Sequence, residues 1–174
     1  AYRILDDISL NYPDERCAEL AVKTKADHLF KEGEYDLAEL EYARLLHDFP
    51  ASRYCQYALR RSAEATLASF AGIDFDDAAL IEAEERYRDY QASYRAAAES
   101  EGVSLILAEI RERQASKKFS VGRYYERTGY LSSAVFYYRS TVKDWPDTVA
   151  ATKAKARLAL LDVESVASRS TYPG

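Results

Sequence analysis

The sequence predicts an all-α solenoid, in which about eight helices form antiparallel pairs that stack into a right-handed superhelix. The first observation is a repeated pattern: an alanine is followed four residues later by a large side chain and eleven residues later by an aromatic one. The second is that only six glycines and four prolines occur in 174 residues, too few for a turn-rich β-sandwich. Repetition of one such unit is the signature of stacked helical repeats. The pattern begins at Ala1, Ala38, Ala83 and Ala134.

Each position of the pattern has a structural role. The alanine lets two helices approach closely, and the residue four positions later lies on the same helical face. The aromatic residue fills the seam where the second helix of a pair ends, and in three of four units a proline then stops the helix. Gly33 and Gly129 each precede a repeat alanine by five residues, where we expect a turn with positive φ. N-caps of the following helices are expected at Asp14, Ser52 and either Asp147 or Thr148.

These signals divide the chain into helices joined by short turns, with no credible strand. The third unit lacks its proline and continues from Tyr94 into Arg95, and Phe70 to Ala78 is expected to form a longer loop. We expect residues 1–166 to form one repeat domain, whose last helix is a cap with a polar outer face, and residues 167–174 to be a disordered tail. The predicted helices cover residues 1–11, 14–32, 35–48, 52–70, 77–94, 99–128, 131–144 and 148–166.

Composition and motifs argue against several classes of function. The net charge of −5 argues against a general nucleic-acid binder, and no apolar run is long enough to span a membrane. Cys17 and Cys55 lack metal-site spacing and are expected to be small buried residues, with a disulfide between neighbouring helices as the alternative. His28 and His47 lie in different predicted helices without an acidic partner at ligand spacing. With no catalytic motif either, we expect no metal, no cofactor and no enzymatic activity.

The repeat resembles the tetratricopeptide repeat (TPR), most closely in LFKEGEYDLAELEYARLLHDFP and in VGRYYERTGYLSSAVFYYRSTVKDWPDT. The distances between successive repeat alanines, 37, 45 and 51 residues, exceed the usual period of about 34 and favour a divergent family. The order of motifs over nearly all of residues 1–166 is similar to that of the BamD-type (YfiO-like) outer-membrane assembly lipoproteins. The motifs are Phe49-Pro50, GIDFDD at 72–77, YRDYQASY at 87–94, YYERTG at 124–129 and WPDT at 145–148.

The resemblance implies a non-catalytic scaffold at the periplasmic face of the outer membrane, within the machinery that assembles β-barrel proteins. It implies that helices 14–32 and 52–70 meet extended segments of unfolded outer-membrane proteins. The region from Arg123 to Tyr138 would dock the POTRA-bearing insertase subunit. Contact with the membrane is expected only through an N-terminal lipid anchor that is absent from this chain, which is interpreted as a trimmed fragment. In AVFYYRST, the sequence departs from an Asn-Arg pair that many family members carry near Phe136 and Tyr137.

In this architecture the first helix of each pair lines the concave side, so its polar or exposed residues are candidates for partner binding. Register with the small residues Ala26 and Gly122 selects them in two helices, and three further candidates lie between these helices. Phe30 would offer an apolar site for a peptide aromatic, whereas Tyr42, Tyr87 and Tyr138 are expected to pack in the repeat seams. The alternative is a solvated face without a partner. The candidates are Lys23, Asp27, Phe30, Lys31, Arg60, Arg61, Glu64, Arg123, Glu126 and Arg127.

Two other functions remain open from the sequence. One is a generic TPR adaptor that binds another envelope or cytoplasmic protein. The other is an accessory or regulatory domain of an enzyme whose catalytic residues lie on a different segment.

Overall fold

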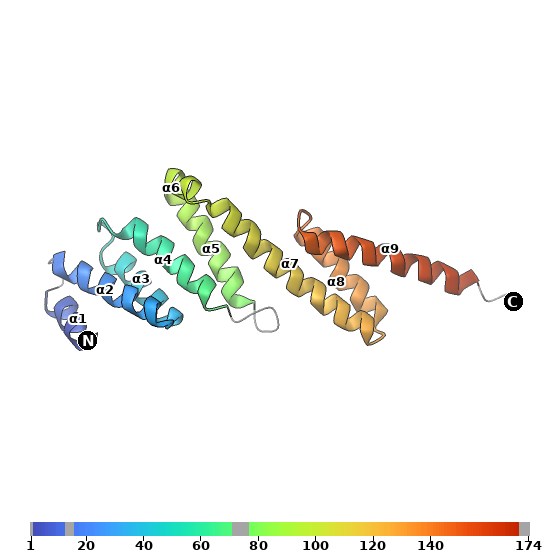
Figure 1. Ribbon diagram of the computed structural model, residues 1–174, viewed down its shortest axis with the longest axis horizontal. Coiled ribbons are helices and arrows are strands. Elements are labelled where there is room, and N and C mark those ends of the chain that lie inside the picture. Colours follow the sequence, from blue (N-terminus) through green and yellow to red (C-terminus); the bar gives the residue numbers. More distant parts are fainter. Residues whose placement is uncertain (1, 13–15, 71–76, 171–174) are drawn as a thin grey trace. The chain divides into compact units, whose positions relative to one another are not determined.

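The computed structural model describes residues 2–12, 16–70 and 77–170, with side chains up to Asp162. All regular structure in these ranges is helical, which confirms the all-α, TPR-like prediction (Figure 1). No helix within them is long and apolar enough to cross a membrane. The helices are α1 (Tyr2–Asn11), α2 (Arg16–Glu32), α3 (Tyr35–Asp48), α4 (Cys55–Ala68), α5 (Ala78–Ser93), α6 (Arg95–Ser100), α7 (Val103–Arg127), α8 (Leu131–Asp144) and α9 (Val149–Ser170).

The predicted helices agree with the structure, apart from shifts of a few residues at their ends, except around residue 100. In place of a helix that starts at residue 99, the chain forms the short helix α6, turns at Gly102 and begins α7 at Val103. Gly102 has a φ of 69°, a backbone conformation that ends a helix and that only glycine adopts at little cost. Tyr94 leaves the helical region with a φ of −133° although no proline follows it. The bend after this aromatic position therefore does not depend on proline.

The turns between paired helices confirm the expectation of positive φ. Gly33 and Gly129 have φ values of 84° and 85°. The Gly33 amide donates to the Phe30 carbonyl at 3.2 Å, and the next amide donates to the Leu29 carbonyl at 3.0 Å. In the second turn the Gly129 amide donates to the Glu126 carbonyl at 3.1 Å, and the next amide donates to the Tyr125 carbonyl at 2.9 Å. These are the two hydrogen bonds of a Schellman motif, so each glycine ends the first helix of its pair and starts the second.

The predicted N-caps have different outcomes. Thr148 caps α9, because its Oγ1 accepts the Ala151 amide at 3.1 Å. Ser52 was wrongly predicted as a helix cap. Its Oγ accepts the Tyr54 amide at 3.1 Å within the turn, and α4 begins only at Cys55. The third expected cap, Asp14, lies outside the described residues.

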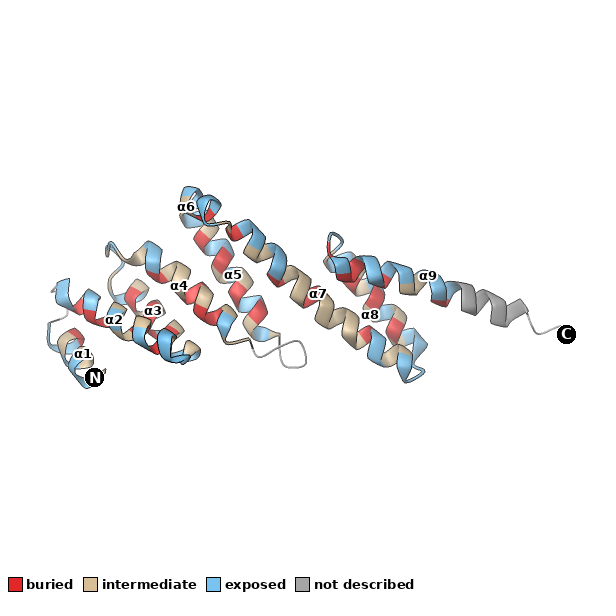
Figure 2. Cartoon of the chain, in the orientation of Figure 1, coloured by how far each residue is buried: buried red, intermediate tan, exposed pale blue. Residues whose placement is uncertain are grey.

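By backbone contacts the chain divides into two compact units, residues 1–107 and 108–174. In the first unit, α1 to α5 each pack on the next helix along the chain, and α2 to α5 each carry buried residues along their length (Figure 2). Ala38, Tyr42, Ala83 and Tyr87 are buried, as the repeat pattern predicts. Burial raises the pKa of Tyr87 to about 12, and the charge of nearby Glu64 adds to this effect.

The second unit packs α8 against α9 around Ala134, Tyr138 and Ala154, with Phe119 of α7 beside them. Tyr138 is fully buried, which again confirms a seam tyrosine. The structure continues α9 to Ser170, four residues beyond its predicted end, while residues 171–174 of the expected tail lie outside the described part.

Two further expectations need correction. Cys17 is exposed and Cys55 only half-buried, so neither is the small buried residue expected, and both thiols are free. The Cys55 thiol donates to the Phe49 carbonyl at 3.3 Å. The outer face of α9 is not uniformly polar, because Val149 and Leu160 are exposed on the helix that also carries exposed lysines.

Candidate protein-binding surfaces

Side chains of α2 and α4 meet in a network of hydrogen bonds, ion pairs and aromatic contacts. We call this surface the α2–α4 face, and it comprises Lys23, Asp27, Phe30, Tyr54, Tyr57, Arg60, Arg61 and Glu64.

Asp27 is the centre of the α2–α4 face. Its Oδ1 accepts the hydroxyl of Tyr42 at 2.6 Å and that of Tyr57 at 2.8 Å. Its Oδ2 pairs with Lys23 Nζ at 2.6 Å. Burial by itself would raise the pKa of Asp27, but these hydrogen bonds outweigh it and the pKa is lowered. Burial first, and then the bond to Asp27, raise the pKa values of Tyr42 and Tyr57. Asp27 therefore stays ionised and links α2 to both α3 and α4.

Arg61 covers the ring of Phe30. Its guanidinium carbon lies 3.7 Å from the ring centroid, a cation–π contact, and Nη1 pairs with Glu64 at 2.6 Å. Tyr35 packs against the same phenylalanine edge-on, with centroids 5.2 Å apart. Phe30, predicted as an open apolar site for a peptide aromatic, is thus engaged on one face by Arg61. The Phe30 ring therefore holds the Arg61 guanidinium in place on the α2–α4 face.

The structure brings most of the predicted N-terminal candidates together. Arg60 pairs with Glu64 at 2.8 Å and with Glu101 at 3.4 Å, which extends the network toward α6. Lys31, by contrast, is exposed at the end of α2 and has no part in the interactions of Asp27 or Arg61. Six of the seven N-terminal candidates therefore belong to one connected surface.

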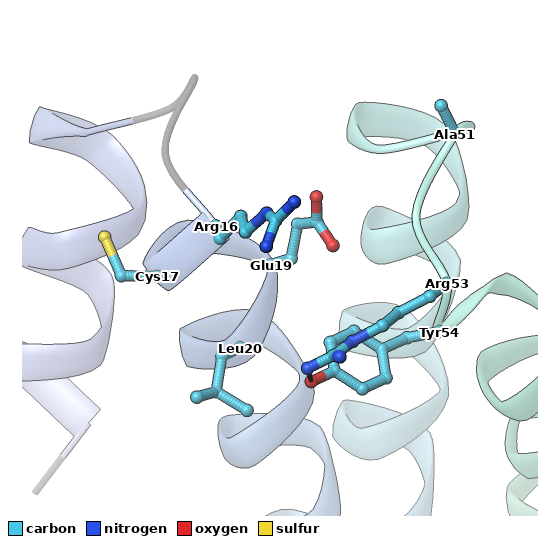
Figure 3. A pocket seen from close by; sticks show the side chains of 7 residues that line it. All are labelled: Arg16, Cys17, Glu19, Leu20, Ala51, Arg53 and Tyr54. Carbon is cyan, nitrogen blue, oxygen red and sulfur yellow. Dashed lines mark hydrogen bonds between the residues drawn. The ribbon is translucent and has the colours of Figure 1, made fainter.

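A cavity of about 530 Å³ opens beside this face, between the start of α2 and the turn that precedes α4 (Figure 3). Figure 3 shows the Arg53 side chain lying across the ring of Tyr54, and its guanidinium carbon is 4.8 Å from the ring centroid. Arg53 Nη2 also donates to the Tyr54 hydroxyl at 2.6 Å. The cavity is lined by Arg16, Cys17, Glu19, Leu20, Ala51, Arg53 and Tyr54.

Arg53 also lines a second cavity, of about 200 Å³. Tyr57, Arg60 and Tyr90 contribute to it, together with Gln56 and Glu101. Arg53 could not be identified from the sequence, because helical register assigns a face only to residues within a helix and Arg53 lies in a turn. Its only signal was that Tyr54 and Tyr57 are tyrosines outside the seam positions of the repeat.

The predicted C-terminal candidates separate into two kinds. Arg123 and Arg127 are exposed on α7. Glu126 instead accepts the hydroxyl of Tyr138 and pairs with Arg157 of α9. It therefore joins three helices of the second unit, and its carboxylate is engaged within that unit.

The same unit exposes a row of aromatic rings within the region from Arg123 to Tyr138, and helical register did not select them as candidates. We call Tyr124, Tyr125, Tyr137 and Phe136 the aromatic row. Tyr125 and Tyr137 stack with centroids 5.4 Å apart and planes at 8°, and the outer two rings each contact one of them edge-on. The outer rings are 54% and 65% exposed. Tyrosine is enriched at the energetic centres of protein interfaces, which makes this row a second candidate surface.

The two units carry opposite net charge. Residues 1–107 contain 22 acidic and 12 basic side chains, whereas residues 108–174 contain 7 acidic and 12 basic ones. The overall charge of −5 conceals this asymmetry, although counting the charged residues of each half of the sequence separately would have revealed it. The second unit therefore favours partners with acidic surfaces.

Stacked helix pairs with a preorganised polar face and an exposed aromatic row define a TPR-like binding protein. Among the described residues, no three His, Cys, Asp or Glu side chains are grouped so that they could hold a metal ion.

The chain belongs to the YfiO family of outer membrane lipoproteins, whose family model matches residues 1–162. This confirms the family that the sequence motifs indicate, and the family is one of outer membrane lipoproteins. No curated protein matches the chain.

Proposed function

We propose that the chain is a BamD-like component of the machinery that assembles β-barrel proteins in the outer membrane. It acts as a binding scaffold at the periplasmic face and is tethered through a lipid anchor ahead of Ala1. The observation that supports this proposal most directly is the α2–α4 face with its two cavities, in a member of an outer membrane lipoprotein family.

The first unit binds extended segments of unfolded client proteins. Lys23, Asp27 and Arg61 are already fixed by ion pairs and hydrogen bonds before a client arrives. Because these side chains lose little freedom on binding, the entropic cost of association is small on the protein's side. Most of the conformational entropy lost on binding is lost by the client segment.

The second unit docks the POTRA-bearing insertase subunit through α7 and α8, from Arg123 to Tyr138. The exposed rings of the aromatic row supply apolar contact area, and the excess of basic side chains in this unit selects an acidic partner surface. The local charges at this interface differ from the Asn-Arg pair of many family members, so the partner contact is remodelled here.

Capture of the insertase by the immobilised chain tests this docking. A Tyr124→Ala, Phe136→Ala double variant should lose capture, because it removes both exposed rings of the row. Tyr12→Ala is the matched control: Tyr12 is 58% exposed, similar to Tyr124, but lies after α1. Equal capture by all three proteins, or none by the wild type, would contradict the proposal. Recovery of an unrelated soluble protein alone would favour the generic TPR adaptor.

A further inference from the structure

Another cavity of the first unit lies where α5, α6 and the start of α7 meet at one bend (Figure 1). Its volume is about 580 Å³, and it shares no residue with the α2–α4 face. The bend after Tyr94 and the turn at Gly102 bring the three helices together. The cavity is lined by Arg88, Gln91 and Ala92 of α5, Arg95 and Glu99 of α6, and Ser104 of α7.

Helix geometry brings the polar side chains of this cavity to one place. Arg88 and Gln91 are three residues apart and therefore share a face of α5. Arg95 and Glu99 are four residues apart and share a face of α6 in the same way. Gln91 Nε2 donates to Ser104 Oγ at 3.1 Å, which ties α5 to α7. The lining therefore comes from three helices whose arrangement is fixed.

Two arginines give the cavity donors for an anion. Arg88 Nη2 pairs with Glu84 at 2.5 Å, which fixes its side chain and leaves its other N–H groups available. Within the described ranges, Arg95 has no ion pair and no side-chain hydrogen bond, so all of its N–H donors are available. A guanidinium is planar and matches two oxygens of a phosphate at once. The arginine pair therefore favours a phosphate group.

Glu99 adds the opposite charge to the lining. It follows Arg95 by four positions, but the structure gives no ion pair between the two side chains. A basic residue that precedes an acidic one at this spacing is the less favourable order for a helical ion pair. The Glu99 carboxylate is therefore open to a ligand, and a primary ammonium with its three N–H donors is a suitable partner.

We propose that this cavity binds a phosphoethanolamine group, with its phosphate on Arg88 and Arg95 and its ammonium on Glu99. A two-carbon link joins the phosphate to the ammonium, so their partners must lie close together. Arg95 and Glu99 meet this requirement, because Cβ atoms at this helical spacing are about 5–6 Å apart. The cavity volume of about 580 Å³ is in the range of small-molecule sites and leaves space for the rest of the ester.

Phosphoethanolamine occurs both in soluble esters and as the head group of a phospholipid, and Leu105 favours the lipid. This residue follows Ser104 in the first turn of α7 and is 76% exposed, the highest value among the large apolar side chains that the structure describes. At a membrane surface, such a side chain enters the boundary of the acyl chains while arginines keep their charged ends among the head groups.

A titration followed by phosphorus NMR tests the site with soluble esters. The ligands are glycerophosphoethanolamine, glycerophosphocholine, whose quaternary ammonium has no N–H to donate, and glycerol phosphate, which has no amine. We expect glycerophosphoethanolamine to bind at least about fivefold more tightly than glycerophosphocholine, because only its ammonium can donate to Glu99. Glu99→Gln should remove this preference.

Variants of Arg95 test the phosphate contact in the same titration. Arg95→Ala should weaken the binding of glycerophosphoethanolamine about tenfold, and Arg95→Lys should weaken it less, because a lysine keeps the charge but not the planar fork. The matched control is Arg3→Ala. Arg3 is exposed on α1 and does not line the cavity, so this change should leave binding unchanged.

Flotation with vesicles distinguishes the lipid from a soluble ester. The chain without a lipid anchor is mixed with vesicles of phosphatidylethanolamine and phosphatidylcholine in equal parts, or of phosphatidylcholine alone. Neither vesicle has net charge, so the basic second unit is not attracted to it. Binding to the mixed vesicles alone, lost in Arg95→Ala and in Leu105→Ser, assigns the lipid. Binding of the soluble ester without flotation supports the site and assigns a soluble ligand.

Three results would overturn the proposal. The first is equal binding of the two glycerophosphate diesters by the wild-type chain, and the second is an Arg95→Ala variant that binds as the wild type does. The third is tighter binding of glycerol phosphate than of glycerophosphoethanolamine, unchanged by Glu99→Gln, which would show a simple anion site. None of these results affects capture of the insertase, so the two proposals fail separately.

Discussion

Gly122→Ala should destabilise the second unit, although alanine favours a helix. Gly122 lies within α7, where replacing glycine by alanine gains about 1 kcal/mol of helix propensity. A Cβ at this position, however, would lie 2.7 Å from Cε1 and 2.8 Å from Cδ1 of Tyr138, well inside van der Waals contact. Overpacking a core typically costs about 1–3 kcal/mol.

The Tyr138 ring is restrained by its surroundings. It is fully buried, its hydroxyl is bonded to Glu126, and Phe119 packs against it with centroids 5.4 Å apart. The cost therefore lies toward the upper end of the range, and the net loss of unfolding free energy should be about 1–2 kcal/mol.

Urea unfolding followed by circular dichroism measures this loss. In a Tyr138→Leu background, the smaller side chain leaves room for the new methyl group, and Gly122→Ala should become neutral or stabilising. The coupling energy from this double-mutant cycle isolates the contact. If Gly122→Ala raises stability in the wild-type background, the claim that α7 and α8 pack closely at Gly122 and Tyr138 is wrong.

Three further predictions follow from the contacts. Glu112→Ala should lower the free energy of unfolding by about 1–2 kcal/mol, because the Glu112 carboxylate accepts the first two amides of α9, at 2.7 and 3.0 Å. Glu109→Ala is an exposed control, and it should lower the free energy of unfolding by less than about 0.5 kcal/mol in the same urea titration. The lowered pKa of Asp27 stabilises the folded state above its unfolded pKa of about 3.9, and this contribution is lost as the pH falls through the folded value. Asp27→Asn should therefore flatten the acid limb of a stability–pH curve, and an unchanged limb would contradict this. Finally, Cys17 should react with a maleimide faster than Cys55, because the Cys55 thiol is half-buried and donates to a carbonyl. Mass spectrometry of the labelled chain measures the two rates, and equal rates would contradict this prediction.

The fold could be predicted from the sequence because its determinants are local. The spacing from Gly33 to Ala38 to Tyr42 specifies a turn, a close helix contact and a seam filler, and each is found in the structure. The break at Gly102 was missed because an isolated glycine in an apolar helical pattern has two interpretations, and only tertiary packing decides between them.

The candidate site was less predictable because it depends on side chains from different elements. The sequence named Asp27 and Arg61 as candidates, and the structure brings them onto one face, but the sequence could not show that Arg61 covers Phe30. Arg53 belongs to a turn, and it lines two cavities only because of how the neighbouring helices pack. Such long-range arrangements leave no periodic signal in the sequence.

A carboxylate from a neighbouring segment satisfies the hydroxyl of a buried tyrosine in several parts of the chain. Tyr42 donates to Asp27, and Tyr138 donates to Glu126. A buried hydroxyl without an acceptor would be costly, so each tyrosine requires its acid. The acids in turn hold Lys23 and Arg157. Core packing and surface charge are therefore coupled: a change at Asp27 that is intended to alter client binding would also loosen the seam beneath it, and binding data on such a variant are interpretable only beside its stability.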